Sequence, residues 1–310
     1  MTRTTAFAAA LLAGLTLSAC GGDPMDDSGG SGDGGNGDGG GGNGGGAVTV
    51  GSANFPENVL LAEIYTAALK GADVKVQQRL NIGNRETYIA GLEDGSIDLI
   101  PEYTGALTLY FNEEAEATEP EGVYTELQEA LPDNLTVLER SEAQNKDAVV
   151  VTSATAEEFD LESIGDLEPV AGDMVLGGPP EWEDRYTGVP GLKEVYGLEF
   201  SAFRPLAAGS NLTAQSLKNG QIDAANIFST DPAIVENDFV VLEDPENLFV
   251  AQNIVPLITT EANDDTVTET LNEVSGSLDT EVLTDMLARV SNEGEDPADV
   301  AQEFVEENMG

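Results

Sequence analysis

The stretch VTVGSANFPEN, residues 48–58, gives the first indication of the fold. The apolar run 48–50 ends in Gly51-Ser52, and residues 57–69 then carry apolar side chains at helical spacing. This order predicts a strand, a tight loop and a helix. The pattern continues with a strand over 74–80, a helix over 85–92, and a strand over 97–100 that we expect Pro101 to stop. Strands that alternate with helices favour a parallel, doubly wound sheet.

The same alternation starts again further along the chain. Apolar runs predict strands over 148–151, 174–176 and 222–228, and helical spacing marks 155–159, 192–196 and 213–218. Two α/β lobes therefore follow one another, and we expect 255–258 and the C-terminal helices to return to the first.

An internal echo supports two lobes. LEDGSIDLI at 92–100 matches LKNGQIDAA at 217–225, each a helix end, a glycine cap and a buried strand. Loops are expected after each strand, at 102–104 and 228–230. Because ligands of open α/β sheets bind beyond the carboxyl ends of the strands, the two loops should face each other across a cleft.

Three stretches of this sequence resemble the first lobe of extracytoplasmic solute-binding proteins: residues 48–58, NIGNRE at 81–86 and IDLIPEYTG at 97–105. In particular, they resemble the glycine betaine/carnitine/choline-binding components of ABC importers. The resemblance continues more loosely to the C-terminus. It implies an α/β, two-lobed periplasmic-binding-protein-like fold, in which each lobe is a mixed, mostly parallel sheet flanked by helices. Residues 47–143 plus 255–310 are expected to form lobe 1, and residues 144–254 lobe 2.

The first residues read as a lipoprotein signal peptide, 1–20. Arg3 precedes an apolar run over 6–17, and Leu17-Ser-Ala-Cys20 has the small residues of a cleavage site. The run is too short to cross a bilayer, for which about 20 residues are needed. Cys20, the only cysteine, is thus the expected point of lipid attachment. Residues 21–46 are nearly all Gly, Asp, Asn and Ser, a composition that predicts a flexible tether.

Composition excludes several functions. The chain has 12 basic and 58 acidic residues, a net charge of −46, so nucleic acid and anionic lipid are not expected partners. A carboxylate-rich surface also suits a protein that works in high salt. No histidine is present, which excludes Ser-His-Asp and Cys-His catalytic sites and removes the commonest metal ligand. We therefore expect no catalytic residues, no cofactor and no metal.

The resemblance also implies ligand-binding residues. In this family aromatic rings surround a quaternary ammonium, which cannot donate an N–H hydrogen bond, and basic groups hold the carboxylate. Tyr103 matches one wall of the aromatic box, Phe228 stands where the family has another aromatic, and Arg185 falls at the carboxylate-clamping arginine. Other readings remain: Tyr103 as an interface aromatic, Phe228 as core, and Arg185 paired with the neighbouring acids Glu183 or Asp184.

The sequence departs from the family pattern at four of its positions. Ala53 replaces a frequent lysine and Ala106 a frequent threonine, while Asp147 and Gln252 stand where tyrosine is common. Asp147 would suit a cation, and most of all one with N–H donors; the alternative is a solvated surface acid. The remaining candidate ligand residues are Asn54, Thr104, Thr230 and the sole tryptophan, Trp182, for which a core position is the alternative.

We therefore expect a monomeric solute-binding protein, held at the outer face of the cell membrane by the Cys20 lipid. It would capture a quaternary ammonium osmoprotectant and deliver it to an ABC permease. The first alternative is the same transport role for another cationic or zwitterionic solute, such as an amino acid. A secreted enzyme on this fold and a sensory receptor domain are more remote.

Overall fold

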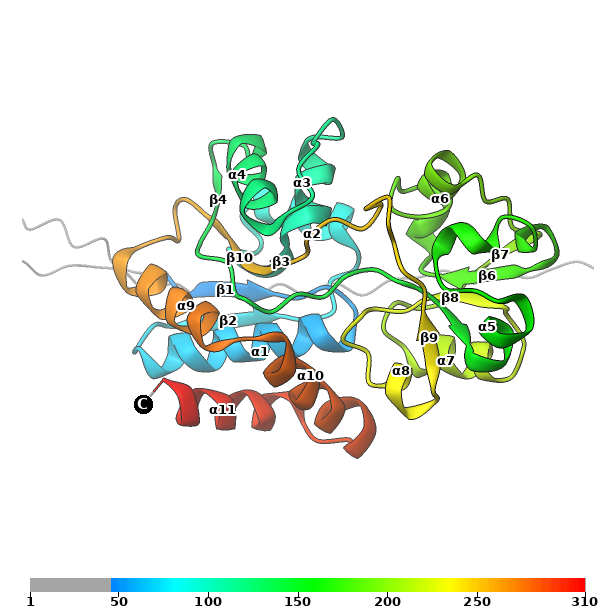
Figure 1. The fold of residues 1–310 in the computed structure, drawn as a ribbon. Coiled ribbons are helices and arrows are strands. Elements are labelled where there is room, and N and C mark those ends of the chain that lie inside the picture. Colours follow the sequence, from blue (N-terminus) through cyan, green and yellow to red (C-terminus); the bar gives the residue numbers. More distant parts are fainter. Residues whose placement is uncertain (1–45, 310) are drawn as a thin grey trace, which may run out of the picture. The chain divides into compact units, whose positions relative to one another are not determined.

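The computed structural model describes residues 46–309 and contains two five-stranded sheets (Figure 1). The signal peptide and almost all of the tether lie outside the described residues. The first sheet has the strand order β2-β1-β3-β10-β4. Its strands are β1 (Val48–Gly51), β2 (Val76–Arg79), β3 (Leu99–Tyr103), β4 (Leu135–Val137) and β10 (Ile254–Thr259). β1 pairs in parallel with β2 and β3, whereas β10 runs antiparallel between β3 and β4.

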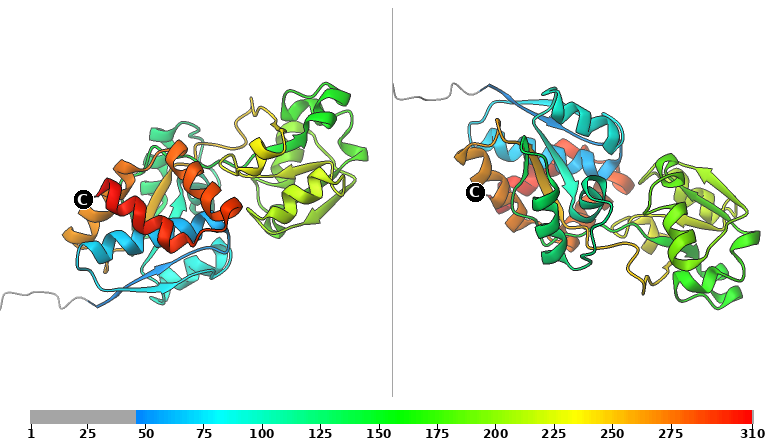
Figure 2. Two further views of the ribbon diagram at one scale, coloured as in Figure 1. Left: turned by 90° about the horizontal axis from the view of Figure 1, so that it is seen from below. Right: turned by 90° about the horizontal axis from the view of Figure 1, so that it is seen from above.

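Helices cover both faces of this sheet, so that β10 is buried along its whole length. Ile254 and Ile258 belong to one core cluster, and Val255 and Leu257 to another, as the two-residue period of a strand requires. The first cluster packs under α1 (Pro56–Gly71), α9 (Asp265–Ser277), α10 (Thr280–Ala288) and α11 (Pro297–Asn308), with a π-helical turn over Arg289–Glu293. The second packs under α2 (Arg85–Glu93), α3 (Thr104–Phe111) and α4 (Pro120–Ala130). α11 lies alongside α1 (Figure 2), so the C-terminal helices complete the first sheet's core.

The second sheet has the order β7-β6-β8-β5-β9, with β6 parallel to β7 and β8, and β5 antiparallel to β8 and β9. Its strands are β5 (Val149–Thr152), β6 (Val175–Gly178), β7 (Ala202–Pro205), β8 (Ala224–Asn226) and β9 (Phe239–Val241). Its helices are α5 (Ser153–Phe159), α6 (Val189–Tyr196), α7 (Asn211–Lys218) and α8 (Ala233–Glu236), with 3-10 turns at Ile164–Leu167, Ala171–Asp173 and Pro180–Glu183. The α/β class with two mixed sheets is confirmed. Each sheet is half parallel and half antiparallel, because one inner strand in each runs against its neighbours.

The sequence echo has a structural basis in two equivalent aspartates. Asp98 accepts a hydrogen bond from the Thr49 N–H at 2.7 Å, and Asp223 accepts one from the Val175 N–H at 2.8 Å. Each carboxylate thus ties the start of its strand to the adjacent parallel strand. The glycines of the echo, Gly95 and Gly220, both have positive φ, 73° and 64°, which glycine adopts at no steric cost.

Two local predictions are wrong. Pro101 does not stop β3, which continues to Tyr103, and no loop covers 102–104 because Thr104 begins α3. Pro101 faces Pro256 of β10, so each proline lies opposite a residue that has no N–H to offer. The Pro256 carbonyl instead accepts a bond from the Leu138 N–H on the other side.

The chain crosses between the two sheets twice, after β4 and again before β10. The crossings touch at an antiparallel bridge between Gln144 and Asn253. Asn253 also donates through its side chain to the Ser141 carbonyl at 2.9 Å. The two connections are therefore held side by side. None of the helices within 46–309 is both long and apolar enough to cross a membrane.

Candidate ligand-binding site

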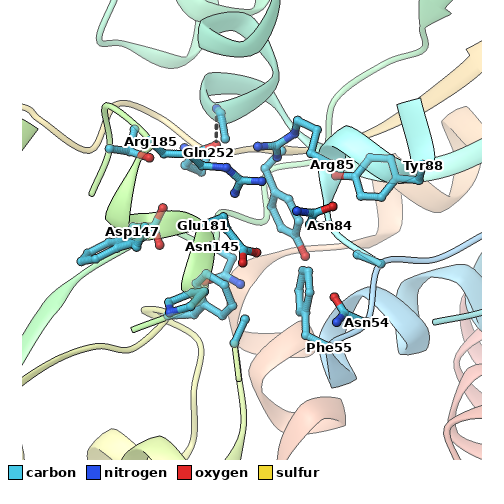
Figure 3. Close-up of a pocket in the computed structure, with 18 residues that line it drawn as sticks. Asn54, Phe55, Asn84, Arg85, Tyr88, Asn145, Asp147, Glu181, Arg185 and Gln252 are labelled. Atoms are coloured by element: carbon cyan, nitrogen blue, oxygen red, sulfur yellow. Dashed lines mark hydrogen bonds between the residues drawn. The ribbon is translucent and has the colours of Figure 1, made fainter. Parts of the chain in front are cut away.

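A cavity of about 710 Å³, counting space open to solvent, lies between residues of the two sheets (Figure 3). Its first side comes from the loop after β1, the start of α2 and the carboxyl end of β3. Its second side comes from the 3-10 turn Pro180–Glu183, the Arg185–Thr187 loop and Phe228 after β8. Asn145, Asp147 and Gln252 reach it from the two crossings.

Three neighbouring aromatic rings line this cavity. Phe55 lies 5.4 Å from Phe228 and 6.1 Å from Tyr103, measured between ring centroids. Phe55 caps α1, and its loop is fixed by Asn58, which accepts from the Ala53 N–H at 2.7 Å and donates to the Pro101 carbonyl at 2.9 Å. The rings therefore come from segments beside both sheets, and aromatic rings offer a ligand an apolar surface that also attracts cations.

A buried glutamate holds Tyr103 in place. The Tyr103 hydroxyl donates to Glu57 at 2.7 Å, Asn145 Nδ2 donates at 2.7 Å, and the Thr230 hydroxyl donates at 2.6 Å. Glu57 is 2 % exposed, and burial raises the pKa of its carboxyl above 4.5. One carboxylate thus joins the first sheet, a crossing and the second sheet directly behind the aromatic rings.

A buried ion pair forms another wall. Arg85 donates to both oxygens of Glu102, from Nε at 2.7 Å and from Nη2 at 2.9 Å. Tyr88 adds a hydroxyl donor at 2.6 Å, and the Tyr103 N–H adds one at 2.8 Å. Glu102 has no exposed surface, and four donors satisfy it. Burial raises the Tyr88 pKa well above its usual value, so this hydroxyl stays protonated.

Arg185 faces the cavity but is paired. Its Nε and Nη2 groups donate to Glu86 at 3.2 Å and 3.0 Å, with a second contact of 3.0 Å to the other carboxylate oxygen. Glu86 lies on α2, so this ion pair links the two sides of the cavity. Burial acts to raise the Glu86 pKa, but a hydrogen bond from its own backbone N–H and the Arg185 guanidinium together lower it. The partner is thus neither Glu183 nor Asp184, which were the neighbouring acids considered from the sequence.

Two polar residues from the crossings complete the lining. Gln252 is 3 % exposed, and its Oε1 accepts from the Ala106 N–H at 2.9 Å. The start of α3 can pack this closely on the segment before β10 because residue 105 is glycine; a Cβ there would lie 2.6 Å from the Ala251 carbonyl oxygen. Asp147 accepts from Asn226 Nδ2 at 2.8 Å, and burial raises its pKa above 3.8.

Comparison with known proteins identifies the family. Residues 46–307 match the family model described as the substrate binding domain of ABC-type glycine betaine transport systems. The chain belongs to this family. The predicted family and the transport role of a substrate-binding protein are thereby confirmed, and this family is not a class of enzymes.

Individual relatives agree with this assignment. A carnitine transport binding protein of Listeria monocytogenes is 24 % identical over 269 residues, which cover 84 % of this chain and 86 % of the relative. A glycine-betaine-binding protein of Pseudomonas aeruginosa is 26 % identical over 275 residues, covering 84 % and 87 %. The crystal structure of a glycine betaine/carnitine/choline ABC transporter protein superposes with a TM-score of 0.67 at 24 % identity, covering 84 % of this chain and 98 % of that one. This likeness shows that the fold is shared.

In this substrate-binding domain, seven of the nine candidate ligand residues line the cavity. They are Asn54, Tyr103, Asp147, Trp182, Arg185, Phe228 and Gln252. Thr104 and Thr230 do not line it: the Thr104 hydroxyl donates to the Ala251 carbonyl at 3.2 Å, and Thr230 is bound to Glu57. Both hydroxyls are consumed by buried partners. Cys20 lies outside the described residues.

Trp182 is both a core residue and a lining residue of the cavity. It is 2 % exposed and stacks on Phe249, with ring centroids 5.9 Å apart and an interplanar angle of 15°. It also borders the cavity. Sequence reasoning missed Phe55, Arg85, Tyr88 and Asn145 as lining residues; Phe55 alone carried a signal, since it directly precedes the proline that begins α1.

No cluster of three or more potential metal ligands occurs within residues 46–309.

Proposed function

We propose that this protein captures a quaternary ammonium osmoprotectant, such as glycine betaine or choline, and delivers it to an ABC importer permease. The observation that carries the proposal is the set of three rings, Phe55, Tyr103 and Phe228, gathered on one cavity of a glycine betaine family domain. A trimethylammonium group has no N–H donor, so ring faces supply its attraction, at about 0.5–2 kcal/mol for each well-placed contact.

Binding on this proposal is coupled to closure of two lobes. We assign 47–143 plus 255–310 to lobe 1 and 144–254 to lobe 2, because each set contains the strands of one sheet, apart from Ile254 at the start of β10. Tyr103 and Phe55 belong to the first lobe, and Phe228 and Arg185 to the second. A solute that touches both sets stabilises the closed arrangement, which the permease then recognises. The seven lining candidates named above are the proposed ligand residues.

A thermal-shift screen of purified protein tests this proposal. Glycine betaine, choline, carnitine and amino acids are compared at constant ionic strength, because the net charge of −46 makes melting sensitive to salt alone. A ligand at 100 times its dissociation constant adds about 2.7 kcal/mol to the free energy of unfolding. A matched Tyr103→Ala variant should show a smaller shift at the same ligand concentration. If none of the quaternary ammonium solutes raises the melting temperature while an amino acid does, the alternative solute class replaces this one.

The protein is further proposed to act without catalysis. Choline and glycine betaine incubated with it should be recovered unchanged, as measured by proton NMR. Appearance of an oxidised or demethylated product would support the enzyme alternative instead.

We propose that the domain works outside the cell and that a lipid on Cys20 anchors it to the membrane. The support is the signal-peptide pattern at 1–20, which ends in Cys20. Cys20→Ser should release the domain into the medium, and fractionation with immunoblotting measures this. Retention of the variant in washed membranes would contradict the anchor. The protein is expected to be monomeric, which light scattering can check.

A further inference from the structure

The charges around the cavity bear on which quaternary ammonium solute the protein prefers. The inference drawn from them rests on the proposed function. A glycine betaine carboxylate is held most strongly by a cationic side chain. Within the described chain, the only basic residues that line the cavity are Arg85 and Arg185. Arg85 is bonded to both oxygens of buried Glu102, and Arg185 to both oxygens of Glu86. Both guanidinium charges are therefore compensated by protein carboxylates.

Two further carboxylates line the cavity without a hydrogen-bonded basic partner among residues 46–309. Asp147 is bonded to the neutral amide of Asn226, and Glu181 on the 3-10 turn is in no ion pair among residues 46–309. Ala53, which also lines the cavity, adds no charge. Once the two compensated pairs are set aside, the lining carries the charge of Asp147 and Glu181, which attracts a net cation and repels a solute carboxylate.

An unpartnered acceptor points in the same direction. Asn145 lines the cavity, is 4 % exposed, and donates through Nδ2 to Glu57. Its Oδ1 accepts no hydrogen bond from any described residue. A buried acceptor without a donor costs free energy, so a ligand that donates a hydrogen bond to it binds more tightly. Asn145, Asp147 and Glu181 appear together among the lining side chains in Figure 3.

We infer that the preferred solute is a net cation that also donates a hydrogen bond, as choline does, rather than a zwitterion such as glycine betaine. The rings hold the methylated ammonium, Asp147 and Glu181 balance its charge, and the hydroxyl donates to Asn145 Oδ1. Both arginines then serve to hold the walls of the cavity.

Isothermal titration calorimetry with three ligands tests the inference. Choline is compared with glycine betaine, which adds a carboxylate, and with propyltrimethylammonium, which replaces the hydroxyl by a methyl group. Choline should bind at least about tenfold more tightly than glycine betaine, a difference of about 1.4 kcal/mol. It should also bind more tightly than propyltrimethylammonium. Equal or tighter binding of glycine betaine would overturn the charge argument, and equal binding of propyltrimethylammonium would overturn the hydrogen bond.

Variants locate the selectivity. Asp147→Asn should weaken choline about tenfold and narrow its advantage over glycine betaine, whereas Glu183→Gln, which removes the same charge outside the cavity, should leave the ratio unchanged. Far-UV circular dichroism and melting curves establish that each variant is folded. If Arg185→Ala weakened glycine betaine far more than choline, Arg185 would be a carboxylate clamp and the inference would be wrong. If no quaternary ammonium ligand bound the wild type, the proposed function itself would fail, which is a different result from betaine binding as tightly as choline.

Discussion

Replacing Glu102 by glutamine should be among the most damaging isosteric changes in the domain. Glu102 has no exposed surface and accepts four hydrogen bonds, including the paired contacts of 2.7 and 2.9 Å from Arg85. Glutamine keeps one acceptor oxygen but turns an NH₂ group toward these donors. It also leaves the Arg85 guanidinium, itself 8 % exposed, without a counter-charge.

The expected loss is about 3–5 kcal/mol of unfolding free energy, the cost of removing one partner of a buried ion pair. Glu295→Gln is the matched control, because Glu295 also pairs with an arginine, Arg289, at 2.7 Å. The side chains of that pair are 36 % and 33 % exposed. Its loss should cost about 0–1 kcal/mol, as for other surface pairs.

Urea unfolding followed by circular dichroism measures both values. With a slope of about 2 kcal/mol per molar urea, a loss of 4 kcal/mol moves the midpoint by about 2 M. Molar sodium chloride should shrink the Glu295→Gln effect and leave the Glu102→Gln effect nearly unchanged, since screening acts on exposed charges. Equal losses in the two variants, or equal responses to salt, would refute the argument that burial sets the value of the Arg85 pair.

Three further outcomes are expected. Burial raises the Glu57 pKa, so the folded state binds this proton more tightly than the unfolded state does. The free energy of unfolding of the wild type, relative to that of Glu57→Gln, should therefore fall as pH rises from 4.5 through the folded pKa. The same pH dependence of urea unfolding in both proteins between pH 4 and 8 would contradict this. Tyr103→Ala should weaken binding of a quaternary ammonium ligand by about 1–3 kcal/mol. Tyr103→Phe should weaken binding much less, but should lower the free energy of unfolding by about 1–3 kcal/mol because Glu57 loses a hydrogen-bond donor. Calorimetry measures the effect on binding, and urea unfolding measures the effect on stability. With a net charge of −46, the melting temperature should rise in molar sodium chloride, and scanning calorimetry that found no change would remove the high-salt interpretation.

The spacing of apolar residues and the positions of Gly and Pro predicted much of the fold because these signals act locally. The β1-loop-α1 unit, the helix at 85–93 and the two Gly-x-Ile-Asp strands all follow from spacing within about ten residues. The extent of β3 could not be predicted this way. Whether a proline ends a strand depends on what lies opposite, and Pro256 is distant in sequence.

The site was less predictable for a related reason. Motif resemblance indicated Tyr103 and Phe228, whose positions follow directly from strand ends. It could not indicate that Glu86, among 58 acidic residues, would be the partner of Arg185, because that contact joins residues 99 apart. Nor could it show Asn145 as a cavity residue, since nothing in the neighbouring sequence distinguishes this buried amide from an amide on the surface.

The position of β10 has a consequence for the order in which the chain folds. β10 lies between β3 and β4, yet Asn253 at its start bonds to Thr104, 149 residues earlier. Closing a loop of that length costs about 4 kcal/mol of chain entropy before any contact is gained. All strands of the second sheet, by contrast, lie within residues 149–241. A chain emerging from the ribosome would complete its second sheet first, and the sheet that begins at residue 48 would stay open until nearly the whole protein had been made.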